Sequence, residues 1–350
     1  MSSTTSYDFT IDSARIAQRP RAFGNQKLLV YHKQADKIEH TTFEALPDLL
    51  CPGDLLVLND TRVVPAQVRL EEPIVGTCSS FLFLDPLCSV TTNMEVLLSS
   101  RVDVGSVLTL PKGLTFRVNE LIGGDPEVHR GNLFGLKGTL HEYLASVGEM
   151  PLPPYVARVP DKEDEKAYQT SVAQVPGAIA APTAGLHFYP ALLERLRAAG
   201  IEHVCLTLHV GYGTFRSFST EFIEQHQMDR ERYHVSVEAG AAIHKALHEN
   251  RRVIAVGTTA TRVLETCADS FLAPSPPEEL SGEAGIFIYP PYKFKVLSGL
   301  FTNFHYPKTS VLTLTAAMVG SRDILIDRIY KEALAREYLW YSYGDGMVVL

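Results

Sequence analysis

Residues 190–210 read PALLERLRAAGIEHVCLTLHV, and this stretch decides the fold class. Pro190 opens a predicted helix that runs to Ala199 and ends at Gly200, because proline suits the first turn of a helix and glycine the position after its end. The apolar run Ile201–Val210 then predicts a strand. A helix followed at once by a strand is typical of α/β proteins.

The same alternation continues through the C-terminal part of the chain. Helical periodicity alternates there with short apolar runs, and two apolar runs near the N-terminus supply further strands. The predicted helices span Val237–Glu249, Thr258–Ala268 and Ser321–Tyr338, and the predicted strands span Leu28–Tyr31, Asp54–Leu58, Arg252–Val256 and Met347–Leu350. Together these elements predict a mixed sheet with helices packed on it.

The middle of the chain follows another pattern. Short apolar or alternating segments are separated by turn residues, which is typical of a small antiparallel β-barrel. The predicted strands are Phe81–Leu84, Glu95–Leu98, Ser106–Leu110, Thr115–Leu121 and Val128–Phe134, followed by a helix over Leu140–Val147. The proline-rich run at 151–154 predicts a boundary. We expect an α/β catalytic domain made of residues 1–66 and 150–350, with a β-barrel domain inserted at 67–149.

Composition excludes several classes of protein. Of the 350 residues, 45% are apolar and 21% are charged, as in globular proteins, and no apolar run is long enough for a membrane span. The N-terminus lacks the apolar segment of a signal peptide. The five cysteines are scattered, which argues for a reducing cytoplasm and against a zinc ribbon. The net charge of −8 disfavours a protein that coats nucleic acid.

Three loops combine a histidine, a hydroxyl group and a glycine or proline close to an expected strand. They are APTAGLHFYPAL (181–192) around His187, TLHVGYGT (207–214) around His209 and FTNFHYPK (301–308) around His305. One such histidine is more often a structural group, but three of them favour a site. The loops predict a pocket for a polar, charged small molecule.

A fourth loop, VGTTATR at 256–262, leads from a strand into a helix. The N–H groups of a helix start favour anions, so Thr258, Thr259 and Arg262 suit a carboxylate or phosphate, although an ordinary helix cap with a surface arginine explains the same residues. Gly211 and Gly213 lack the third glycine of a dinucleotide-binding turn. We expect them to let the backbone approach a flat ligand.

Several acidic residues admit two interpretations. His226, Asp229 and Glu231 lie in one short segment, but their spacing matches no standard zinc site, and we expect no metal. Asp60, just after a predicted strand, and Asp345, near the C-terminus, belong either to a site or to turns. The sequence contains no P-loop, nucleophile elbow or zincin motif.

From end to end, the chain resembles the S-adenosylmethionine:tRNA ribosyltransferase-isomerase family of queuosine biosynthesis. The resemblance rests on long motifs in the same order, which together are highly specific. They are YDF (7–9), GDLLV (53–57), NDTRV (59–63), PLPPY (151–155), YQT (168–170), APTAGLHF (181–188), TLHVG (207–211), VGTT (256–259), FIYP (287–290), TNFH (302–305) and SYGD (342–345).

The resemblance implies an α/β fold with an inserted barrel and one particular reaction. In it, the ribosyl part of S-adenosylmethionine moves to 7-aminomethyl-7-deazaguanine at the wobble position of a tRNA anticodon. The RNA then carries epoxyqueuosine, and adenine and methionine leave. S-adenosylmethionine is therefore a substrate, and no metal or redox cofactor is implied. The expected partner is that tRNA, and we expect no association with a membrane. A monomer and a homodimer both fit the sequence.

The residues suit this chemistry, which needs a base for the acidified ribose carbon beside the sulfonium and an acid for the adenine leaving group. With the resemblance in place, we assign acid–base work to His187, His209 and His305, oriented by Asp60, Glu231 or Asp345. Substrate binding is assigned to Thr183, Gly185, Phe188, Gly211, Tyr212, Gly213, Gly257, Thr258, Thr259, Arg262, Asn303 and Phe304. Among these, the aromatic rings would stack on a base, and the loop from Gly257 to Arg262 would face the methionine carboxylate. RNA binding is assigned to Arg15, Arg19, Arg62, Lys293 and Lys308.

The chain departs from the family pattern at positions that carry charge or a histidine. An arginine-rich stretch reads AFGNQK (22–27), and Gln67, Asp229, Pro291 and Leu339 replace an arginine, a histidine, a glycine and an arginine. Groups of the lost kinds meet RNA phosphates or move protons. Two alternatives therefore stay open: a non-catalytic paralogue that binds RNA or a nucleoside, and a transferase of the same fold with another acceptor.

Overall fold

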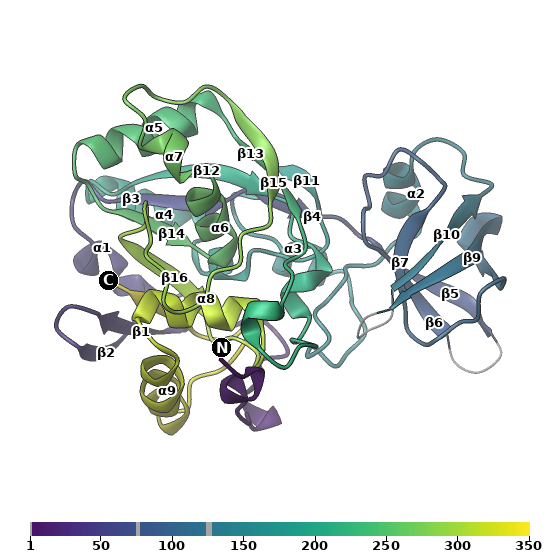
Figure 1. Ribbon diagram of the computed structural model, residues 1–350, viewed down its shortest axis with the longest axis horizontal. Coiled ribbons are helices and arrows are strands. Elements are labelled where there is room, and N and C mark those ends of the chain that lie inside the picture. The colour runs from purple at the N-terminus through teal and green to yellow at the C-terminus, as the bar shows by residue number, and fades with distance from the viewer. Residues whose placement is uncertain (1, 75–77, 124–127) are drawn as a thin grey trace.

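The computed structural model describes residues 2–74, 78–123 and 128–350, and its larger part is built on a nine-stranded mixed sheet (Figure 1). The central strands run parallel, and antiparallel pairs lie toward both edges. Across the sheet the order is β15 (Leu280–Ala284), β13 (Glu231–Val235), β12 (Glu202–Leu208), β3 (Leu55–Asn59), β14 (Val253–Val256), β16 (Gly299–Asn303), β17 (Gly346–Val349), β1 (Lys27–His32) and β2 (Lys37–Thr42). The predicted mixed α/β sheet is confirmed.

Both faces of this sheet are buried, which explains the continuous apolar runs. In β3, Leu55 and Val57 belong to one core, and Leu56 and Leu58 belong to the other. A sheet that is covered by helices on both sides needs no polar face. One face is covered by α1 (Leu46–Leu49) and α4 (Pro190–Ala198), and the other by α5 (Val237–His248), α6 (Thr258–Thr266), α7 (Ala268–Phe271), α8 (Ser310–Val319) and α9 (Lys331–Ala335).

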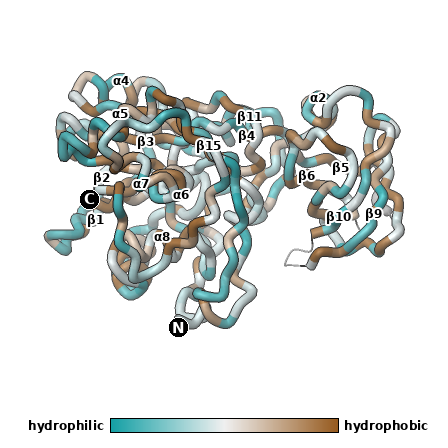
Figure 2. Tube along the Cα trace, turned by 45° about the horizontal axis from the view of Figure 1, so that its top comes forward, coloured by the Kyte–Doolittle hydropathy of each residue, from teal (hydrophilic) through white to brown (hydrophobic). Residues whose placement is uncertain are grey.

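The second sheet has six antiparallel strands and stands apart from the first (Figure 1). Its order is β5 (Gln67–Ile74), β6 (Cys78–Phe83), β7 (Met94–Leu98), β10 (Val128–Phe134), β9 (Leu114–Gly123) and β8 (Val107–Leu110). The outermost strands β5 and β8 contact each other, so the sheet is nearly closed, as predicted. Hydrophobic and hydrophilic segments alternate along these strands (Figure 2). Phe81, Phe83 and Phe116 fill a separate core, to which α2 (Leu140–Val147) contributes.

The chain enters and leaves the barrel at adjacent points. The backbone N–H of Gln67 donates to the carbonyl of Glu149 (3.3 Å), and the N–H of Glu149 donates back to the carbonyl of Gln67 (2.7 Å). A segment whose two ends are paired in this way and which has its own core suits an insertion. The division into 1–66 with 150–350 and 67–149 stays a prediction that these contacts support.

The predicted helix over 321–338 is present, but it is shorter at its C-terminal end and is not α-helical throughout. A π-helical segment over Ile324–Tyr330 precedes α9, which ends at Ala335. The wider turn carries Tyr330 into an aromatic cluster with Phe9, Phe304 and Trp340. These partners all lie outside the helix, and Phe9 and Phe304 are far away in the sequence, so hydrophobic periodicity does not encode the wider turn.

Several elements were absent from the prediction. They are α1, α3 (Asp164–Ala167), α7, α8, β2, β5, β13, β15, β16 and the pair β4 (Thr61–Val63) and β11 (Val175–Ala178). In α8, nine of the ten residues are buried, so the helix shows no amphipathic period. Among the described residues, no helix has the length and apolar character that crossing a membrane requires.

Candidate active site

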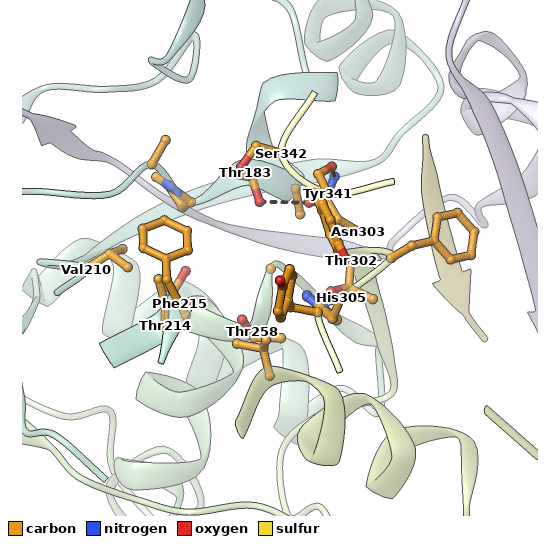
Figure 3. A pocket seen from close by; sticks show the side chains of 18 of the residues that line it. Thr183, Val210, Thr214, Phe215, Thr258, Thr302, Asn303, His305, Tyr341 and Ser342 are labelled. Carbon is orange, nitrogen blue, oxygen red and sulfur yellow. Dashed lines mark hydrogen bonds between the residues drawn. The ribbon is translucent and has the colours of Figure 1, made fainter. Parts of the chain in front are cut away.

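The main pocket lies where four neighbouring strands of the large sheet end. Since β12, β3, β14 and β16 run parallel, their carboxyl ends meet at one edge, where α/β sheets usually bind ligands. A cavity of about 300 Å³ lies there (Figure 3). Its walls include Tyr155, Thr183, Val210, Tyr212, Thr214, Phe215, Gly257, Thr258, Thr259, Thr302, Asn303, Phe304, His305, Tyr306, Tyr341 and Ser342.

Gly257 turns the chain from β14 into α6 and brings two threonines to the pocket. Its φ of 96° lies in the region that glycine adopts without steric cost. Its N–H donates to the carbonyl of Phe301 (2.8 Å), which ties the turn to β16. Thr258 and Thr259 then line the pocket at the N-terminus of α6, where free N–H groups favour an anionic or strongly polar ligand.

Asn303, at the end of β16, connects three segments around the pocket. Its Oδ1 accepts a hydrogen bond from the Thr183 hydroxyl (2.9 Å), drawn as a dashed line in Figure 3. Its Nδ2 donates to the carbonyl of Tyr341 (3.3 Å) and to Nε2 of His187 (3.3 Å). Asn303 is 2% exposed, so its amide group depends on these partners rather than on water.

His305 is the histidine that lines the main pocket. Its Nε2 shares a hydrogen bond of 2.6 Å with the Thr302 hydroxyl, and its backbone N–H donates to the Tyr330 hydroxyl (3.1 Å). These bonds fix the ring and leave Nδ1 for a ligand. Burial lowers the pKa of His305 to about 3, so the imidazole is neutral at pH 7.

The other two predicted histidines lie outside the walls of the main pocket. His187 stacks on Phe43 with ring centres 4.1 Å apart and borders a separate cavity of about 230 Å³. His209 bonds through Nδ1 to the Thr61 hydroxyl (2.9 Å) and packs against Gly177, where an added Cβ would lie 2.7 Å from Nδ1. Burial lowers the pKa of both rings. The loops converge as predicted, but packing against distant segments turns two rings away.

The predicted carboxylate partners of the histidines are corrected by the structure. Asp60 accepts from the Thr207 hydroxyl (2.6 Å), and burial raises its pKa. Glu231 forms an ion pair with Arg262 and accepts from the N–H of Gly211 (2.7 Å). Asp345 is fully buried and accepts from the N–H groups of Lys27 (2.6 Å) and Leu339 (2.8 Å) and from Arg21. The histidines are instead hydrogen-bonded to Thr61, Thr302 and Asn303, whose hydroxyl and amide groups lie at or near the ends of neighbouring strands.

The remaining predicted substrate residues divide between walls and core. Thr183, Tyr212, Gly257, Thr258, Thr259, Asn303 and Phe304 line the main pocket, and Gly213 and Arg262 line a narrow cavity beside it. Phe188 is fully buried between Phe43 and Phe301, so its predicted stacking on a base is wrong in this structure. Gly185 permits close packing, since a Cβ there would lie 2.8 Å from Thr170.

The predicted RNA-binding cations fall into two groups. Arg15, Arg19 and Lys308 form ion pairs with Glu337, Asp161 and Asp8. Arg62 and Lys293 are exposed. RNA binding by these five residues stays a prediction. Arg62 and Lys293 are the more accessible of them for contacts with RNA phosphates.

An aromatic wall of the pocket escaped the sequence analysis. Tyr155 and Tyr341 lie with ring centres 4.5 Å apart, Tyr306 lies 5.2 Å from Tyr341, and Phe215 lies 6.0 Å from Tyr155. The Tyr155 hydroxyl also shares a hydrogen bond of 2.7 Å with Ser342. The signal was available, because Tyr155 follows the proline-rich boundary and Tyr341 starts the terminal glycine-containing turn. Within the described part of the chain, no group of three or more His, Cys, Asp or Glu side chains has the arrangement of a metal site.

Replacing the buried His187 by glutamine should flatten the pH dependence of stability. Burial, with a smaller contribution from Arg21, lowers the pKa of His187 to about 3, whereas an exposed histidine titrates near about 6.5. As the pH falls from about 6.5 to about 3, the imidazole binds a proton in the unfolded chain but stays neutral in the folded protein. The free energy of unfolding therefore falls by up to about 1.4 kcal/mol per pH unit from this group.

Urea unfolding at pH 7, 6 and 5 would measure this slope. We expect a smaller slope in His187→Gln and an unchanged one in the control His248→Gln, whose side chain is exposed. Equal slopes in the wild type and His187→Gln would contradict the neutral state of the buried ring.

Comparison with known proteins identifies the family. Residues 4–349 match the family described as "Queuosine biosynthesis protein". Relatives from Desulfitobacterium hafniense and Chlorobaculum parvum, both named S-adenosylmethionine:tRNA ribosyltransferase-isomerase, are 40% identical over 345 and 344 residues, which cover 98% of this chain and 98% of each relative. A crystal structure of an S-adenosylmethionine tRNA ribosyltransferase from Thermotoga maritima is 28% identical, with a TM-score of 0.55, covering 99% of this chain and 100% of that one. These findings confirm the resemblance of the motifs: the chain belongs to the queuosine biosynthesis protein family.

Proposed function

We propose that this protein transfers the ribosyl moiety of S-adenosylmethionine to 7-aminomethyl-7-deazaguanine in a tRNA anticodon, forming epoxyqueuosine and releasing adenine and methionine. The observation that carries the proposal is the pocket at the strand ends. It combines a neutral histidine, hydroxyl and amide groups and an aromatic wall, in a chain whose relatives are named for this activity. S-adenosylmethionine is the donor substrate, and the proposed reaction uses no further cofactor.

In this proposal His305 moves the proton. It takes the proton from the ribose carbon beside the sulfonium, which the positive sulfur acidifies. Since the pKa of His305 is lowered to about 3, the imidazolium that forms is a strong acid. It therefore suits protonation of adenine as that base leaves. His187 acts indirectly, as a positioning residue, because it contacts Asn303 rather than the pocket.

The walls offer groups for the other parts of the substrates. The rings of Tyr155, Phe215, Tyr306 and Tyr341 suit stacking on adenine or on the deazaguanine, and aromatic faces also attract the sulfonium cation. The pair of Thr183 and Asn303 presents polar atoms to ribose hydroxyls. The predicted roles of Tyr212, Thr258 and Thr259 fit the same walls.

The tRNA would approach along the junction of the two sheets. A cavity of about 160 Å³ there is lined by Ser80 and Leu97 of the barrel and shares Pro154, Tyr212 and Phe215 with the main pocket. A base turned out of the anticodon thus has a route from the barrel surface to the site. We place the protein in a reducing cytoplasm, because Cys51, Cys78, Cys88, Cys205 and Cys267 are all free thiols.

The test is an incubation of the purified protein with S-adenosylmethionine and a tRNA that carries 7-aminomethyl-7-deazaguanine. We expect adenine and methionine to appear only with that tRNA, with epoxyqueuosine in the RNA. A tRNA with unmodified guanine at the wobble position is the control. Folded protein that releases neither product would overturn the proposal and favour a non-catalytic binder or a different acceptor.

A further inference from the structure

A narrow cavity adjoins the main pocket and has a different chemical character. Its volume is about 30 Å³, and it shares Thr214, Thr258, Thr259 and Val311 with the main pocket. Since about 10–15 Å³ of such space holds one water-sized group, two or three polar groups fit. The cavity is therefore large enough for the head group of a small molecule whose remainder lies in the main pocket.

Arg262 lines this cavity and carries an unsatisfied donor. Its side chain is 9% exposed and forms an ion pair with Glu231, whose side chain is 6% exposed. The Nη1 atom of Arg262 is buried and has no hydrogen-bond partner among the described residues. Burial lowers the pKa of Arg262 to about 10, so it stays protonated at pH 7. A buried, charged donor without an acceptor is costly, and an anionic oxygen would remove that cost.

Asp229 supplies the opposite charge. It lines the same cavity, contacts Arg216 (Nη1 to Oδ2, 3.4 Å) and acts electrostatically on Arg262. Its side chain is 51% exposed, so a carboxylate oxygen remains accessible. Gly213 makes room for it, because a Cβ at that position would clash with the Asp229 carboxylate.

The charges of the cavity decide which ligand fits. Arg216 and Arg262 balance Asp229 and Glu231. A phosphate would meet two carboxylates, and a simple amine would meet two guanidinium groups. A zwitterion, with one carboxylate and one ammonium group, matches both signs at once.

We propose that this cavity binds the α-amino-acid head group of the sulfonium donor, with its carboxylate on Nη1 of Arg262 and its ammonium group on Asp229. This inference rests on the proposed function and deepens it, because it names the methionine subsite. It extends the earlier assignment of Arg262, which alone would select any anion.

Titration calorimetry on the full-length wild type tests the inference. The ligands are S-adenosylmethionine, its decarboxylated analogue and its deaminated analogue. Each analogue should bind about 10- to 100-fold more weakly, since hydrogen bonds to charged groups have that effect. Arg262→Gln should lose the preference for the carboxylate, and Asp229→Asn should lose only the preference for the ammonium group. The control Arg230→Gln, whose side chain is 76% exposed, should keep both.

The outcomes separate this inference from the proposed function. If the wild type binds the decarboxylated analogue as tightly as S-adenosylmethionine, the head-group site is overturned, while tRNA-dependent adenine release still supports the proposed function. If the wild type binds S-adenosylmethionine neither alone nor with the tRNA, both proposals fail. If Arg262→Gln does not fold, the comparison of ligands on the wild type decides the question alone.

Discussion

Replacing His305 by alanine should lower the rate constant of adenine release by about 10²- to 10⁴-fold, the usual contribution of a general acid–base group. His305 lines the main pocket, and a hydrogen bond of 2.6 Å to Thr302 fixes its ring. Binding of S-adenosylmethionine should change little, because the binding walls remain. Single-turnover release of adenine would give the rate constant, and calorimetry would give the affinity.

The control for this variant is His248→Ala, which removes an exposed histidine from the last turn of α5 and should leave the rate unchanged. The pH profile adds a second readout. Burial lowers the pKa of His305 to about 3, so the wild-type rate should not decline as the pH falls from 7 to 5.5 through protonation of this base. If the rate constant of adenine release in His305→Ala falls by less than about tenfold, His305 does not carry out the proton transfer.

Replacing Asp345 by asparagine should cost about 3–5 kcal/mol of stability, the range for breaking a buried ion pair. Asp345 is completely buried, pairs with Arg21 and accepts from the N–H groups of Lys27 and Leu339. An asparagine amide would bring N–H groups toward these donors and leave Arg21 without its counter-ion. Urea unfolding at pH 7 would measure the change.

This variant also decides between two roles for Asp345. If it is a positioning residue of the fold, the folded fraction of Asp345→Asn keeps most of its rate of adenine release. If it is catalytic, the rate falls while the unfolding midpoint stays. Asp269→Asn is the matched control, because its side chain is 88% exposed and pairs with Lys295 at the surface, so stability should change by less than about 1 kcal/mol.

Much of the fold followed from local patterns. The helix over 190–199, the strand after it and the helix over 140–147 were predicted to within one or two residues. Proline and glycine mark the ends of the first helix, and the structure adds a Thr139–Glu142 capping box at the start of the second. The helix over 310–319 was missed, since a fully buried helix has no polar face to reveal its period. The π-helical segment was missed because Tyr330 packs against aromatic rings that lie outside the helix, Phe304 and Trp340.

The sequence by itself determined the family, the mixed sheet with a second, nearly closed antiparallel sheet, and the convergence of loops at one edge of the mixed sheet. Periodicity, turn residues and the order of motifs encode these properties locally. Only the tertiary structure decided which side chains reach the pocket. His187 faces Phe43, Asp345 faces Arg21 and Lys27, and Arg262 faces Glu231, each from a segment far away in the chain. The direction of a side chain at a strand end depends on which groups elsewhere in the chain pack against it or form hydrogen bonds with it when it is buried. The spacing of residues along the chain does not encode these contacts.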